Sequence, residues 1–148
     1  MAAMETFKNL LGGFAGAIAL NILHETYRRL DHDAPRIDLI GEEALSKSLL
    51  YVGVDPPKGN ARYTATLAGD LISNSLYFSM IGVGNQKFTI LRGIAYGFSA
   101  GVGALKLPNS LGLKDAPVTK TDKTKILTVG WYILGGIVAA LAINKLKK

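Results

Sequence analysis

The chain contains no cysteine, only 5 prolines and a single tryptophan among its 148 residues. Without cysteine it has no disulfide bond, no thiolate metal site and no cysteine nucleophile. Charged residues are also scarce at 19%, below the roughly 25% of ordinary soluble domains. The charges gather between long apolar stretches, whereas a soluble domain spreads them more evenly. This pattern argues against a soluble helical domain, which is the simplest alternative for such a chain.

Hydrophobic residues make up 49% of the chain, and its mean hydropathy is +0.24. The apolar runs cover residues 9–23, 63–86, 93–105 and 126–144. A helix of ~20 residues crosses a hydrocarbon core of ~30 Å. The first and third runs reach this length only if Glu25 and Arg92 lie in or near the membrane. The last run is apolar on every face, where a surface helix has a polar stripe.

These runs predict an all-α membrane protein, a four-transmembrane-helix bundle that forms a single domain over residues 1–148. We expect the spans at residues 6–30, 62–83, 88–105 and 122–145. Pro108 is expected to end the third span, because proline disfavours helical angles in the residue before it.

A short amphipathic helix is expected at residues 38–52, in the first long loop. Asp38 is a candidate N-cap, and Gly53 suits the left-handed position after the helix. The apolar stripe of this helix fits two placements, one parallel to the membrane in its interface and one packed on the bundle. The sequence leaves both open.

The chain carries a net charge of +6, and its basic residues flank the apolar runs without interleaved aromatic residues. We therefore expect membrane lipids as partners, through their anionic headgroups, and no nucleic acid. If Arg92 is excluded, the two long loops hold eleven Lys and Arg residues against five on the other side. The positive-inside rule then places the long loops in the cytoplasm.

The third span has glycines at spacings of four, at Gly93, Gly97 and Gly101. Burial alone does not drive helices together in lipid, and small residues let helix backbones approach and gain dispersion contacts. The pattern predicts a helix-packing face. It serves either within the bundle or between chains, in a homo-oligomer or with another membrane protein.

Polar side chains recur along one side of each of the first two spans. They are Asn21, His24, Glu25 and Arg28 in the first span and Asp70 and Asn74 in the second. A charge at the centre of a membrane costs ~2.5–3.5 kcal/mol on insertion scales, so such residues face the protein interior or a wet cavity. If both helices end near the first long loop, Asn21 and Asp70 lie at similar depth.

Two readings of this cluster are open. The leading one is a site that passes or binds a small polar solute, an ion or a proton between the first two spans. In the other, Asp70 forms a structural ion pair with Arg28 or His24. The protein is then a non-catalytic accessory or lipid-binding scaffold subunit.

No catalytic or metal-binding pattern is recognisable. The string from His24 to Arg28 begins like HExxH, but arginine stands where the second histidine must be. No Walker loop and no Ser/His/Asp arrangement occurs. We therefore expect no metal, no cofactor and no enzymatic activity.

Short strings offer one comparison with a known family. They are Gly-Phe-Ala-Gly at 13–16, Glu25, Ala-Pro-Arg at 34–36 and Leu-Gly-Leu at 111–113 after Pro108. In this respect the chain resembles YagU-type small bacterial inner-membrane proteins, which are largely uncharacterised but linked to survival in acid. The resemblance implies a multi-pass protein of the bacterial inner (plasma) membrane. That family typically has histidine after Ala-Gly in its second helix, where this chain has Asp70.

Overall fold

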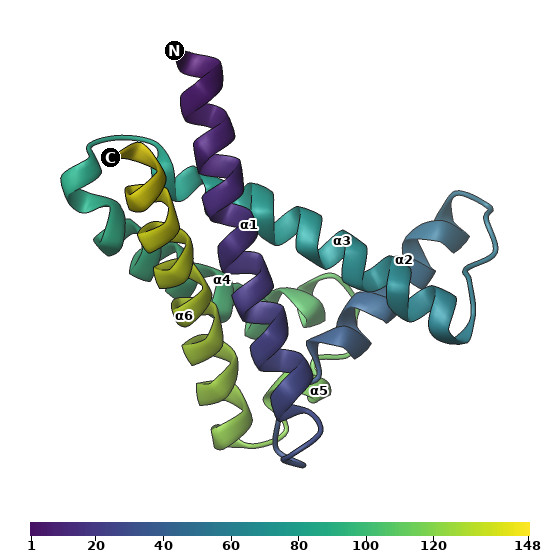
Figure 1. Ribbon diagram of the computed structural model, residues 1–148. Helices are drawn as coiled ribbons and strands as arrows, with labels where there is room; N and C mark the ends of the chain where they lie inside the picture. Colours follow the sequence, from purple (N-terminus) through teal and green to yellow (C-terminus); the bar gives the residue numbers. More distant parts are fainter.

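The computed structural model describes residues 1–148 and consists of helices joined by turns, with no strand (Figure 1). The helices are α1 (Ala2–Tyr27), α2 (Ile37–Tyr51), α3 (Gly59–Ser79), α4 (Thr89–Ser110), α5 (Ala116–Thr119) and α6 (Asp122–Lys147). Two 3-10 turns, η1 (Met80–Gly82) and η2 (Gln86–Phe88), join α3 to α4. The expected all-α class is confirmed.

Three segments are long and apolar enough to cross a membrane: α1, Gln86–Ser110 and α6. This is consistent with a membrane protein. The expected second span, α3, does not belong to this set. Its length of 21 residues is sufficient, but Asp70, Asn74 and the polar residues of its first turns lower its hydropathy.

Contacts between distant segments define two ends of the molecule. At the first, which we call the terminal end, Lys147 Nζ lies 3.1 Å from Glu5 Oε2 and donates a hydrogen bond to the Gly82 carbonyl. At the opposite, loop end, Lys123 Nζ lies 2.5 Å from Asp31 Oδ2. Both chain termini lie at the terminal end (Figure 1). The chain therefore runs away from its N-terminus in α1, returns in α3, and repeats this path in α4 and α6.

The helices pack around α6, which contacts α1 on one side and α4 on another. Helix α3 crosses α1 obliquely, and α2 lies beside the first half of α3, so that these two segments project as an arm (Figure 1). Few contacts join α3 to α4. The arm and the α1–α4–α6 group thus diverge towards the loop end.

The three glycines of α4 lie against the backbone of α6. A Cβ atom on Gly93 would be 2.6 Å from the Gly136 carbonyl oxygen, and one on Gly101 would be 2.7 Å from Val129 Cα. At Gly97 it would overlap the α6 backbone as well. The glycine face of α4 is therefore used for packing within the chain, against α6.

Helix boundaries differ most from expectation at Pro108. Helix α4 continues through this residue to Ser110, so the predicted end at residue 105 is wrong. A proline in a helix removes one hydrogen bond and crowds the carbonyl of the residue four before it, effects that a helix tolerates best close to its ends. The following turn is closed by hydrogen bonds from Leu111 N to Leu107 O at 2.9 Å and from Leu113 N to Pro108 O at 2.8 Å.

The helix of the first loop begins and ends within one residue of its expected bounds. Gly53 follows it with a φ of +77°, as predicted. The predicted N-cap role of Asp38 is wrong, because Arg36 occupies the cap position and no side chain caps the helix. Leu45 and Leu49 are half-buried towards the protein, while Tyr51 at its end is almost fully exposed.

The first prediction tests the contact between α4 and α6. Gly97→Ala should lower the free energy of unfolding by about 2 kcal/mol or more, because the new methyl group overlaps backbone that cannot move independently. Gly103→Ala is the matched control on the same helix, since its Cβ would meet only the flexible Leu107 side chain at 3.4 Å. Thermal unfolding in detergent, followed by circular dichroism, measures both. Equal melting temperatures would show that the contact contributes little.

Candidate functional site

A polar cavity of about 270 Å³ lies between the second half of α1, α2 and the first half of α3. Five of the residues predicted for the site line it: Asn21, His24, Glu25, Arg28 and Asp70. The sixth, Asn74, is hydrogen-bonded to Asp70 but lies outside the cavity wall. The structure therefore brings together the polar residues that helical spacing placed on facing sides of two helices.

Asp70 is held by two neutral amides. Asn21 Nδ2 donates to its Oδ2 at 2.9 Å, and Asn74 Nδ2 donates to its Oδ1 at 2.9 Å. The expectation that Asn21 and Asp70 lie at similar depth is confirmed. The expected ion pair of Asp70 with Arg28 or His24 is wrong, because the ion pairs of Arg28 are made elsewhere. Asp70 thus has no cationic partner among the side chains of the chain.

Arg28 is the centre of a separate ionic network at the loop end. Its guanidinium lies 2.9 Å from Glu25 Oε2 and 2.9 Å from Asp38 Oδ2, and Arg36 binds the same Asp38 carboxylate at 2.6 Å. The Tyr63 hydroxyl donates to Glu25, and the Arg28 guanidinium lies 5.0 Å from the centre of the Tyr63 ring. Each carboxylate of the network therefore has an arginine partner.

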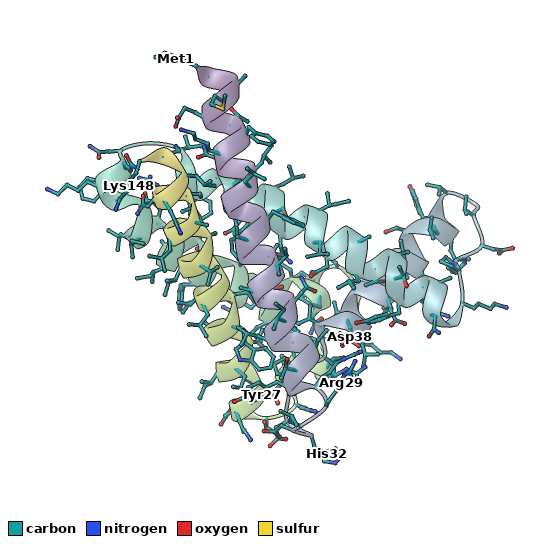
Figure 2. The ribbon with its side chains drawn as sticks, viewed as in Figure 1. Met1, Tyr27, Arg29, His32, Asp38 and Lys148 are labelled. Carbon is teal, nitrogen blue, oxygen red and sulfur yellow. The ribbon has the colours of Figure 1, made fainter.

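Asp38 comes from α2 and lies beside the C-terminal end of α1 (Figure 2). Burial raises the pKa of its carboxyl, but the hydrogen bonds and charge of Arg36 and the charge of Arg28 outweigh that effect. The net result is a pKa below the ordinary value of the carboxyl group. The ionised form of Asp38 is thus the form that this network stabilises.

His24 lies between the cavity and α6. Its ring contacts the Trp131 ring in an edge-on arrangement, with the centroids 4.9 Å apart. Its Nε2 atom is buried and has no hydrogen-bond partner in the protein. An unpaired buried polar atom costs free energy, so a hydrogen bond from a bound molecule to this nitrogen would be favourable.

Among the wall residues that were not predicted as site residues, Asp38 and Tyr63 belong to the ionic network. Tyr63 had a usable signal, because it precedes Asp70 by seven residues, two helical turns, and so lies on the same face of α3. For Asp38 the sequence held no usable signal, because an aspartate at the start of a helix is as typical of an N-cap as of a site residue.

No group of three or more His, Cys, Asp or Glu side chains is arranged to hold a metal ion. Three carboxylates and one guanidinium line the cavity, those of Glu25, Asp38, Asp70 and Arg28. Arg28 and Arg36 bind Asp38, and Arg28 and Arg29 lie 2.9 Å and 3.7 Å from Glu25, so Asp70 is the one carboxylate of the cavity without an ion-pair partner. The arrangement suits the binding of a cation by a carboxylate.

In comparisons with protein-family models, curated proteins and solved structures, this chain matched none. The resemblance to YagU-type proteins therefore stays a prediction from short strings.

The second prediction concerns the ionic network. Asp38→Asn should lower the free energy of unfolding at pH 7 by about 2 kcal/mol, because it removes charge-assisted hydrogen bonds to two arginines. The folded-state pKa of Asp38 is lowered, so its contribution is complete above the unfolded pKa of about 4 and is lost as the pH falls through the folded value. The stability difference between wild type and variant should therefore shrink from pH 6 to pH 3.

Asp55→Asn, at an exposed loop position, is the control and should match the wild type at each pH. Denaturation in detergent at a series of pH values measures all three proteins. A difference between Asp38→Asn and wild type that does not change with pH would exclude the ionised pair as its cause.

Proposed function

We propose that this protein is a multi-pass membrane protein that binds a small organic cation in the cavity between α1, α2 and α3. The observation that carries the proposal is the Asp70 carboxylate, which lines the cavity and has only the amides of Asn21 and Asn74 as partners. A carboxylate in or near a membrane is costly without a compensating charge. A bound cation supplies that charge.

The composition of the cavity favours an ammonium group over a metal ion. The carboxylates of Glu25 and Asp38 are already bound by arginines, so Asp70 would be the only free anionic ligand. One carboxylate does not satisfy the several oxygen ligands that Mg²⁺ or Ca²⁺ requires. An ammonium group needs only a few acceptors, which Asp70 and the Ser73 hydroxyl on the same wall offer.

The alternative is a non-catalytic accessory or scaffold subunit in which Asp70 only joins α3 to α1. That role needs the hydrogen bonds of Asn21 and Asn74 but no ligand. It is weakened by the charge of the residue, since a neutral glutamine or asparagine could join the helices without the cost of a buried carboxylate. A binding measurement separates the two roles.

We further propose that α3 is a fourth span, so that both termini lie on one side of the membrane. Support comes from the path of the chain, because α3 runs obliquely from the tip of the arm, past α1, towards Gly82 at the terminal end (Figure 1). Ile72 and Leu76 are exposed on its outer face and Met80 follows them at the same spacing at the start of η1, which suits contact with lipid. Asp70 and Asn74 lie on its inner face.

The third prediction tests the cation site. In lipid nanodiscs, wild-type protein should bind butylammonium, measured by calorimetry, and Asp70→Asn should weaken that binding at least tenfold, equivalent to about 1.4 kcal/mol. The variant should stay folded, because asparagine keeps the volume of the side chain and part of its hydrogen bonding. Asp55→Asn is the charge-matched control and should bind as the wild type does. Undetectable binding by wild type, or equal binding by Asp70→Asn, would refute the proposed function.

The fourth prediction tests the topology, for which the absence of cysteine is an advantage. Ala3→Cys and Lys148→Cys should react with a membrane-impermeant maleimide added to intact cells. Lys58→Cys and Asp115→Cys, in the two long loops, should react only after the cells are opened. Labelling of residues 3 and 148 from opposite sides would show that α3 does not cross the membrane.

A further inference from the structure

An apolar groove of about 660 Å³ lies between α2, α3 and α4. Ten of its 16 lining residues are hydrophobic, against five of 16 in the polar cavity. Its walls include Ile40 and Ala44 of α2 and Ala100, Ala104 and Leu107 of α4. The groove results from the divergence of the α2–α3 arm from α4 (Figure 1).

The groove and the polar cavity share a wall. Ile37, Gly41 and Ser73 line both, and Asn74, which donates to Asp70, lines the groove. Asp70 therefore stands where the two spaces adjoin. A molecule with one polar and one apolar part can therefore place its polar part near Asp70 and its apolar part in the adjoining groove.

The side of α4 that faces the groove is built from small residues. Ala100, Gly103 and Ala104 lie there, next to the glycine face that packs on α6. A Cβ atom on Gly103 would meet only the Leu107 side chain of its own helix, at 3.4 Å. No other helix fills this space, and an unfilled apolar space forgoes dispersion contacts that hydrocarbon would supply.

We propose that the ligand is an amphipathic ammonium compound. Its ammonium group binds Asp70 in the polar cavity, and its hydrocarbon chain lies in the groove between α2, α3 and α4. This inference rests on the proposed cation site and adds the class of cation. The uncompensated charge at the junction selects a cationic headgroup, which neither a neutral lipid nor the apolar face of a second copy provides.

The test compares ligands and variants in lipid nanodiscs. The ligands are butylammonium, decylammonium and decanoate, and affinities are corrected for partitioning with empty nanodiscs. Wild type should bind decylammonium at least tenfold more tightly than butylammonium, because the longer chain buries more apolar surface. Decanoate has the same tail with the opposite charge and should not bind.

Gly103→Leu fills the groove, and Gly130→Leu is its matched control, because a Cβ at Gly130 meets nothing within 4 Å. Gly103→Leu should keep the affinity for butylammonium and lose the advantage of the longer chain. Gly130→Leu should behave as the wild type does, and Asp70→Asn should lose both ligands.

The outcomes separate the two proposals. Failure of wild type to bind either ammonium ion refutes the cation site and the inference with it. Butylammonium binding that depends on Asp70, with no gain from the longer chain or no effect of Gly103→Leu, refutes only the amphipathic ligand. Loss of a dimer in Gly103→Leu, with amine binding unchanged, would assign the groove to a second copy and overturn the inference.

Discussion

The close approach of α6 to its two neighbours is the constraint on which the other contacts depend. Gly135 and Gly136 are adjacent in the chain, yet they serve different contacts. Gly16 of α1 is seated on the Gly135 carbonyl, and Gly93 of α4 on the Gly136 carbonyl. In lipid, dispersion between closely packed backbones replaces the hydrophobic effect as the force that joins helices. Helix α6 therefore holds α1 and α4 against two of its sides. Little of its surface is left for α3, which packs mainly against α1.

This constraint explains why the cavity and the groove exist. Near the terminal end α3 is held tightly, since a Cβ on Gly13 would lie 2.7 Å from Ser79 N. Farther along, longer side chains join the two helices, through the hydrogen bonds from Asn21 to Asp70 and from Tyr63 to Glu25. Helix α2 enters the space between them without filling it. The polar residues of the site thus lie in the part of the α1–α3 contact where side chains, and not closely packed glycines, join the two helices.

The parts of this structure that the sequence predicted are those governed by spacing along one helix. Residues three and four apart share a face, which placed Asn21 opposite Asp70 and put Gly93, Gly97 and Gly101 on one packing surface. The sequence could not reveal which acid would bind Arg28. The partner of Arg28 depends on how the loop after α1 directs α2 back towards α1. The spacing of residues along one helix does not predict the course of that loop.

Asp38 also bears on whether Asp70 has a cationic partner. With Asp38 and Glu25 on its guanidinium, Arg28 has two carboxylate partners within its own end of the molecule and does not reach Asp70. The first-loop helix therefore does more than cover the bundle. By satisfying Arg28 it leaves the charge on α3 uncompensated, and the same helix forms one wall of the cavity that this charge faces. A segment that local sequence marks only as a surface helix is thus what converts a pair of polar helices into a site with an unmatched negative charge.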